Sequence, residues 1–179
     1  GEPHFGIVGV SLRSPAVRDA LAPQQGLYTV MRRDAGSEGR PRQRLQVVGN
    51  LLDMFVAPED PEAVLEAIAA PATRIVSLTV TEKGYHPEPA DLARPEAPRS
   101  TLGFLVHGLA LRHARGLAPV TLLSCDNLAS NGDTLRGLVL AFAQQVDAAL
   151  ADWIARECTF PNSMADRIVV LSEGRVLQS

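Results

Sequence analysis

The sequence predicts a doubly wound α/β domain, in which a mostly parallel sheet carries helices on both faces. Apolar runs of strand length alternate with helical patterns along the chain, as they do in proteins built from strand–helix–strand units. The later strand-like runs are apolar at consecutive positions, which is typical of parallel strands covered on both sides. A length of 179 residues suffices for one domain with a core and is too short for two ordinary ones.

Each strand is predicted from a run of β-branched and other apolar residues. These runs occupy residues 5–12, 26–33, 44–56, 74–80 and 119–125. Helical patterns occupy residues 15–21, 58–70, 101–116, 134–146 and 148–158. The polar stretch "DAGSEGRP" between the second and third runs predicts a turn.

Start and stop signals support three of these helices. Asp60 is expected to cap the second helix, with Pro61 at its first helical position. Ser100 is expected to cap the third helix and Gly116 to end it. Asp133 is expected to open the fourth helix, which places Asn131 and Gly132 in the turn before it.

The composition describes a soluble globular protein. Hydrophobic residues make up 46% and charged residues 21% of the chain, with a formal net charge of -3, which argues against binding nucleic acid through basic patches. No apolar run approaches the roughly 20 residues of a membrane span, and no signal-peptide pattern opens the chain. Cys125 and Cys158 are the two cysteines and lack the spacing of a metal site. We therefore expect a cytoplasmic protein without a disulfide framework or a bound metal.

Polar clusters follow three of the predicted strands. They are "RSP" after residue 12, "TEKGY" after residue 80 and "SCDNLASNG" after residue 123. Ligands of open α/β sheets bind beyond the carboxyl ends of the strands, so these clusters favour a nucleotide-like ligand. No G-x-G-x-x-G turn occurs within the chain, and the spacing of residues alone names no reaction.

Three stretches of the sequence resemble the long-chain mannitol dehydrogenase family, which includes mannitol 2-dehydrogenases and fructuronate reductases. They are "RIVSLTVTEKGY", "PVTLLSCDNLASNG" and "FPNSMADRIV", and the similarity covers most of residues 5–169. The resemblance implies an NAD(P)-dependent oxidoreductase that needs no metal and moves a hydride between a polyol or hexonate secondary alcohol and the matching ketose. It also implies a Rossmann-like domain, a helical C-terminal domain and an active site between them. Details of the first two stretches slightly favour the hexuronate-type reductases.

The resemblance implies roles in substrate binding for two residues. Asn127 matches a catalytic Asn that stabilises the reacting oxygen, which a neutral amide can do by donating a hydrogen bond. Asp166 matches a residue that accepts hydrogen bonds from sugar hydroxyls. Without the resemblance, Asn127 reads as a turn residue and Asp166 as a surface partner of Arg167.

The resemblance also implies four cofactor-binding residues. Thr81 and Glu82 stand where family members pass the nicotinamide, and Arg13 and Ser14 stand near the adenosine ribose. After the second strand of the family, members often carry acidic residues that bind the ribose of NAD. This chain has Pro15 and Ala16 there, with Arg13 and Arg18 nearby. NAD is therefore the expected cofactor, and NADP is also possible because arginine can pair with its 2′-phosphate.

The chain departs from the family pattern in its extent. The Gly-rich opening unit and the helical domain with the catalytic Lys lie outside the resemblance, and the sole lysine, Lys83, does not match the catalytic position. We therefore expect an incomplete Rossmann-like domain over residues 1–169 and an unassigned tail over 170–179, without the helical C-terminal domain. The expected partners are a sugar alcohol or hexuronate, within a monomer or small homo-oligomer. The alternative is a non-catalytic nucleotide-binding module with the same fold.

Neither histidine of the third helix is expected to act in a site. His107 and His113 lie six residues apart and are interpreted as packing or surface residues. Cys125 is interpreted as a small buried residue rather than a nucleophile, because no histidine is expected beside it.

Overall fold

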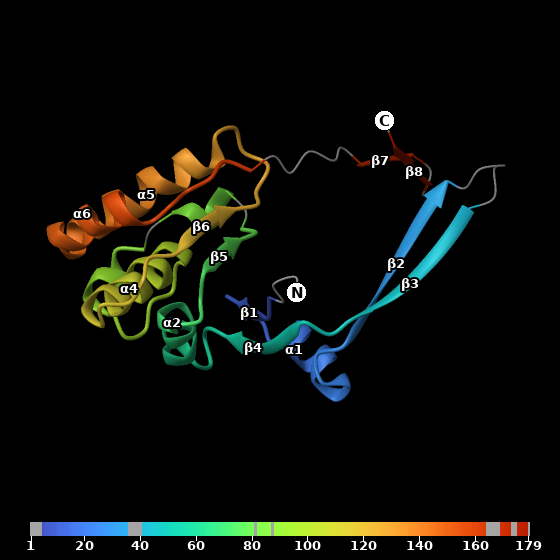
Figure 1. The fold of residues 1–179 in the computed structure, drawn as a ribbon, viewed down its shortest axis with the longest axis horizontal. Helices are drawn as coiled ribbons and strands as arrows, with labels where there is room; N and C mark the ends of the chain where they lie inside the picture. Colours follow the sequence, from blue (N-terminus) through green and yellow to red (C-terminus); the bar gives the residue numbers. More distant parts are fainter. Residues whose placement is uncertain are drawn as a thin grey trace. The chain divides into compact units, whose positions relative to one another are not determined.

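The computed structural model of the protein describes residues 5–35, 41–80, 82–86, 88–163, 169–172 and 175–178. The chain forms two compact units, Gly1–Ala67 and Ile68–Ser179. The division falls within helix α2 (Pro61–Ala69). Figure 1 shows the elements of both units along the chain.

The first unit contains one parallel and one antiparallel strand pair. Its elements are β1 (Ile7–Ser11), α1 (Ala16–Leu21), the 3-10 turn η1 (Ala22–Gln24), β2 (Tyr28–Ala35), β3 (Pro41–Val48) and β4 (Leu51–Val56). Strands β1 and β4 pair in parallel, with Gly9 opposite Met54. Strands β2 and β3 form an antiparallel two-stranded ribbon, with Met31 opposite Leu45.

The predicted strand over residues 44–56 is divided in two in the structure. Strand β3 ends at Val48 and β4 begins at Leu51. The two parts have different partners, since β3 pairs antiparallel with β2 whereas β4 pairs parallel with β1. Val47 and Val48 end β3 and Leu51 and Leu52 begin β4, so the apolar pattern continues across the break at Gly49 and Asn50.

The second unit packs helices around a parallel strand pair. Its elements are β5 (Ile75–Leu78), the 3-10 turn η2 (Glu82–Tyr85), α3 (Ala90–Ala93), α4 (Thr101–Ala114), β6 (Thr121–Ser124), α5 (Asn131–Val146), α6 (Ala148–Glu157), β7 (Val169–Ser172) and β8 (Arg175–Gln178). Strands β5 and β6 are parallel, while β7 and β8 are antiparallel. The core draws on α4, β6, α5 and α6 through Leu102, Leu105, Val106, Leu109, Leu122, Leu135, Val139, Phe142, Leu150 and Ile154.

The helix signals predicted from sequence are confirmed for α2 and α4. The Asp60 carboxylate accepts a hydrogen bond from the Ala63 amide at 2.9 Å, and α2 begins at Pro61. The Ser100 hydroxyl accepts from the Gly103 amide at 3.0 Å. Gly116 ends α4 in a left-handed conformation, with φ of 63°, which a residue without a Cβ adopts without strain.

The prediction that Asp133 opens α5 is wrong. The helix begins at Asn131, so Asn131 and Gly132 belong to its first turn. The cap comes from a distant residue, because Asn162 Oδ1 accepts from the Gly132 amide at 2.8 Å and from the Asp133 amide at 3.2 Å. Asn162 therefore satisfies the backbone donors that a local cap would bind.

The parallel α/β class predicted from sequence is confirmed. Strands β1 and β4 pair in parallel, as do β5 and β6. The β5–β6 connection contains α4, as a parallel crossover requires. The single domain predicted over residues 1–169 stays a prediction.

Candidate functional site

A hydrogen-bond cluster lies at the carboxyl end of β6. The Tyr85 hydroxyl lies 2.7 Å from the Ser124 hydroxyl and also donates to the Asp126 carboxylate. The Cys125 amide continues the strand pairing by donating to the Leu78 carbonyl at 2.8 Å. The turn η2, which follows β5, is therefore joined to the segment that follows β6.

The environment of Tyr85 keeps its hydroxyl protonated. Its side chain is 6% exposed, and burial is the main cause that raises its pKa from 10.0 to about 12, followed by the bond to the Asp126 carboxylate. A phenolate beside that carboxylate would bring two negative charges together in a poorly solvated place. Tyr85 is therefore a neutral hydrogen-bond donor at physiological pH.

Asn131 joins three backbone segments through its buried amide. Its Nδ2 lies 3.2 Å from the Ser124 carbonyl, 2.9 Å from the Asp126 carbonyl and 3.0 Å from the Ser163 carbonyl. Its Oδ1 accepts from the Ser163 amide at 2.9 Å. Since the side chain is 1% exposed, these contacts replace its hydration and make it a structural residue.

Asn127 has a different environment although it is only four residues away. It is exposed, and its amide has no hydrogen-bond partner among the residues that the structure describes. It is the central residue of a three-residue turn that the Leu128 amide closes by donating to the Asp126 carbonyl at 2.9 Å. With respect to the described residues, the side-chain amide of Asn127 is therefore available to donate to a ligand.

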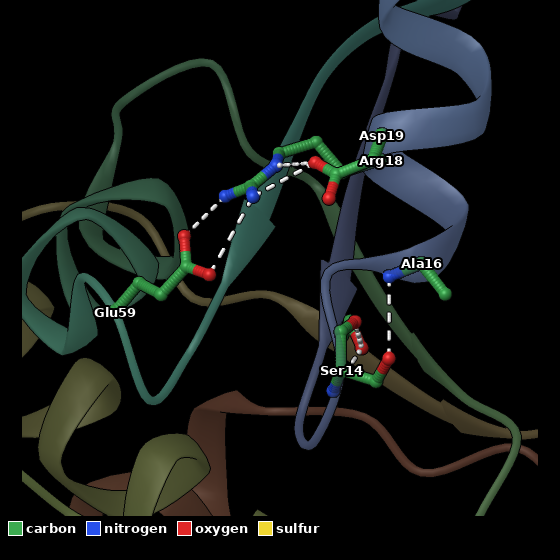
Figure 2. Close-up of polar contacts among 6 residues, drawn as sticks. Ser14, Ala16, Arg18, Asp19 and Glu59 are labelled. Carbon is green, nitrogen blue, oxygen red and sulfur yellow. Dashed lines mark hydrogen bonds and ion pairs between the residues drawn. The ribbon is translucent and has the colours of Figure 1, made fainter.

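The carboxyl end of β1 forms a second polar turn, in the first unit. The Ser11 hydroxyl donates to the Ser14 carbonyl at 2.7 Å, and the Ser14 hydroxyl accepts from the Ala16 amide at 3.2 Å (Figure 2). Arg13 and Ser14 are both exposed. Ser14 thus supports the first turn of α1, and Arg13 presents its side chain to solvent.

Arg18 on α1 is held by two carboxylates. It donates from Nε to Asp19 at 2.9 Å and from Nη1 to Glu59, as Figure 2 shows. The bond to Glu59 is the main cause that raises the pKa of Arg18, with Asp19 second. One guanidinium and two carboxylates leave one net negative charge beside the turn that contains Ser14.

The structure locates only part of the site predicted from sequence. Asn127, Arg13 and Ser14 are placed as described above. Thr81 and Asp166 lie outside the described residues, and of Glu82 only the backbone, at the start of η2, is described. Their predicted roles stay predictions.

Sequence reasoning missed three residues that shape the segment after β6. Tyr85, Asn162 and Ser163 all lie within the motifs quoted for the resemblance, but their partners are about 30 to 40 positions away in the chain. The interpretation of His107 as a packing residue is confirmed, since it is buried and its Nε2 lies 2.8 Å from the Asp91 carbonyl.

A family model described as the Mannitol dehydrogenase Rossmann domain matches residues 2–176. The chain belongs to this family. The family resemblance inferred from the three sequence stretches is therefore confirmed, together with the Rossmann-like class of the fold.

Named relatives in the mannitol dehydrogenase family share about two-fifths or more of their aligned residues with the chain. The chain is 45% identical to mannitol 2-dehydrogenase of Phaeosphaeria nodorum, in an alignment that covers 92% of this chain and 31% of that protein. It is 41% identical to mannitol 2-dehydrogenase of Neosartorya fischeri, covering 94% and 36%. The chain thus spans about a third of the length of these relatives.

Solved structures of the family agree with the fold. A Pseudomonas fluorescens mannitol 2-dehydrogenase in ternary complex with NAD and D-mannitol matches with a TM-score of 0.82 and 38% identity, over 92% of this chain and 36% of that chain. A D-sorbitol dehydrogenase in substrate-free form matches with a TM-score of 0.83 and 37% identity, over 95% and 38%.

Two searches of the structure concern other kinds of site. Within the described residues, no three His, Cys, Asp or Glu side chains are grouped as a metal site would need. None of the described helices is both long and apolar enough to cross a membrane.

Proposed function

We propose that the protein containing this chain is an NAD-dependent oxidoreductase that interconverts a polyol and the matching ketose. The observation that carries the proposal is the contrast between Asn127 and Asn131. The Asn131 side chain is buried and hydrogen-bonded to Ser124, Asp126 and Ser163, whereas Asn127 is exposed on a turn with its side-chain amide unpaired among the described residues. Proteins of this fold class bind ligands beyond the carboxyl ends of their parallel strands, and the exposed amide of Asn127 follows such a strand end.

Asn127 is proposed to stabilise the reacting oxygen of the substrate. When a secondary alcohol loses hydride, negative charge develops on its oxygen, and a fixed donor stabilises that charge. An amide donates without titrating, so Asn127 supplies this stabilisation at any working pH. Asp166 is proposed to accept hydrogen bonds from the other hydroxyls of the substrate.

The chain offers suitable groups for a nicotinamide cofactor, which would supply the hydride acceptor or donor of the reaction. Arg13 and Ser14 are exposed at the carboxyl end of β1, and Thr81 and Glu82 follow β5 in the sequence. Parallel strands carry their ligand groups at such ends. We propose that the first pair contacts the adenosine end and the second pair the nicotinamide end.

The charges beside the first pair favour NAD over NADP. Arg18 is already bound by Asp19 and Glu59, so it is not free to pair with a 2′-phosphate. The net negative charge of this cluster would repel a phosphate there. Arg13 is exposed on the same turn and its charge equals the net charge of the cluster in magnitude, so the preference for NAD rests on Arg18 being already bound.

The substrate is proposed to be a sugar alcohol. The relatives are named for mannitol and sorbitol, which supports the polyol branch more than the hexuronate branch that the motifs slightly favoured. A cytoplasmic location and a monomer or small homo-oligomer are also proposed for the whole protein.

The test is the substitution Asn127→Ala in the full-length protein. We expect kcat for mannitol oxidation or fructose reduction to fall about 10²-fold, as for other single donors to a developing oxyanion, with the Kd of NADH unchanged. Asn50→Ala, at another exposed asparagine, is the matched control and should leave kcat unchanged. Comparing NADH with NADPH in the same assay tests the cofactor preference.

Two results would contradict the proposal. Unchanged turnover in Asn127→Ala would remove Asn127 from the reaction. The complete absence of turnover with polyols, ketoses and hexuronates in the unmodified protein, with NADH still binding, would favour the non-catalytic nucleotide-binding module instead.

A further inference from the structure

Tyr85 is a buried residue, and among the described residues its hydroxyl contacts only the segment that carries Asn127. It belongs to η2, after β5, and its hydroxyl meets the Ser124 hydroxyl and the Asp126 carboxylate at the end of β6. Apart from these two contacts, the side chain packs in the hydrophobic core of the second unit.

The donor pattern in this cluster is determined by the carboxylate. A phenol carries one proton, and the Tyr85 hydroxyl donates it to Asp126. The Ser124 hydroxyl then donates to the Tyr85 oxygen at 2.7 Å, with the Asp126 carboxylate as a more distant acceptor at 3.5 Å. The Ser124 hydroxyl oxygen accepts from the Asp126 amide at 3.3 Å. Both ends of Asp126, the amide and the carboxylate, are thus bound to this pair of hydroxyls.

The carbonyl of Asp126 is bound as well. It accepts from the Leu128 amide at 2.9 Å, which closes the turn around Asn127, and from Asn131 Nδ2 at 2.9 Å. The residue before Asn127 is therefore held at its amide, carboxylate and carbonyl. The position of the Asn127 side chain depends on this residue, since the turn has no other closing bond among the described residues.

We propose that Tyr85 is a positioning residue, which holds Asp126 and thereby the turn that presents the Asn127 amide to the substrate. The inference rests on the proposed function of Asn127. Donors to a reacting oxygen must be held within a fraction of an ångström to be effective. The phenol ring supplies that rigidity because it is packed in the core, while its hydroxyl supplies a charge-assisted bond.

The test is Tyr85→Phe in the full-length protein, alone and combined with Asn127→Ala. Removing the hydroxyl keeps the ring in the core and leaves the Asp126 carboxylate with only the longer contact from the Ser124 hydroxyl, at 3.5 Å, among the described residues. We expect kcat to fall about tenfold, since a hydrogen bond to a charged group is stronger than one between neutral groups and only part of it acts through the turn. The Kd of NADH should be unchanged, and Tyr28→Phe, the other tyrosine, should have no effect.

The double variant separates positioning from a merely structural role. If Tyr85 acts through Asn127, then Tyr85→Phe lowers kcat in the unmodified protein but not in the Asn127→Ala background. An equal loss in both backgrounds, or no loss in either, would overturn the inference. Unchanged turnover in Asn127→Ala alone would instead contradict the proposed function, so the two failures are distinguishable.

A second, conservative substitution tests the same inference if Tyr85→Phe folds poorly. Asp126→Asn keeps an acceptor oxygen for the phenol and removes the charge, so we expect a smaller loss of kcat, about threefold, that again vanishes in the Asn127→Ala background. A loss that persists in that background would overturn the inference equally.

Discussion

At the residue scale, burial decides what two chemically identical side chains do. Asn127 and Asn131 follow the same strand, yet Asn127 is exposed whereas Asn131 is buried, with 1% of its surface exposed. A buried amide must find protein partners because its lost hydration costs free energy. Asn131 therefore stabilises the segment after β6, whereas Asn127 keeps its amide available to a ligand.

Asn131→Ala is expected to lower the free energy of unfolding by about 2–3 kcal/mol. The substitution removes one hydrogen bond from each of the Ser124 and Asp126 carbonyls, which keep the Ser163 hydroxyl and the Leu128 amide as donors. It also removes the acceptor of the Ser163 amide in a place with little water. Urea denaturation of the full-length protein measures the loss. Asn127→Ala is the control and should change stability by less than about 0.5 kcal/mol. Equal losses in the two variants would contradict the assignment of structural and functional roles.

At the element scale, α4 is held by close packing and by one buried cation. Arg112 is fully buried. Its guanidinium donates to the Ile68 carbonyl at 2.9 Å and to the Ala70 carbonyl at 2.7 Å, and so binds carbonyl groups at the C-terminal end of α2. Burial lowers the pKa of Arg112, and the bonds to carbonyls compensate for the lost hydration. Gly108 lets the same helix approach Ile68, because a Cβ there would lie 2.6 Å from the Ile68 Cγ2.

Gly108→Ala and Gly137→Ala are expected to have opposite effects on stability. The first forces a methyl group against Ile68 and should cost about 1–3 kcal/mol. The second places alanine on an exposed position of α5, with nothing within 4 Å of the added Cβ, and should stabilise by about 0.5–1 kcal/mol. Thermal unfolding of both variants measures the difference. A stabilising Gly108→Ala would show that α4 does not approach Ile68 this closely.

At the scale of the whole molecule, the protonation of Tyr85 links stability to alkaline pH. The folded state holds its pKa at about 12, against 10.0 for an unperturbed tyrosine. Above pH 10 the unfolded chain releases this proton while the folded protein retains it, so rising pH favours unfolding. The stabilisation is complete below about pH 10 and is lost as the pH rises to about 12.

The free energy of unfolding should therefore fall more steeply for the unmodified protein than for Tyr85→Phe between pH 10 and 11.5. Urea denaturation at pH 8, 10 and 11.5 measures the two slopes. The Phe variant lacks the titrating group, so the difference between the proteins isolates Tyr85 from the other groups that titrate in this range. Parallel slopes would contradict the raised pKa of Tyr85.

Local patterns account for the parts of the fold that sequence reasoning predicted correctly. The strand runs, the Asp60 and Ser100 caps and the Gly116 stop each depend on neighbours within a few positions. The start of α5 was wrong because its cap, Asn162, is 30 positions away from Gly132. Asn127 was predicted as a site residue from the family resemblance, while its exposure was not visible in the sequence.

The sequence by itself determined the alternation of strands and helices, the start of α2, both ends of α4 and the family, because these follow from periodicity, local hydrogen bonding and motif order. Only the tertiary structure decided the division of residues 44–56 into two strands with different partners, the burial of Asn131 and the bond from Tyr85 to Asp126. The physical reason is that partners far apart in the chain decide strand pairing and burial, and a one-dimensional pattern contains no record of which distant groups meet.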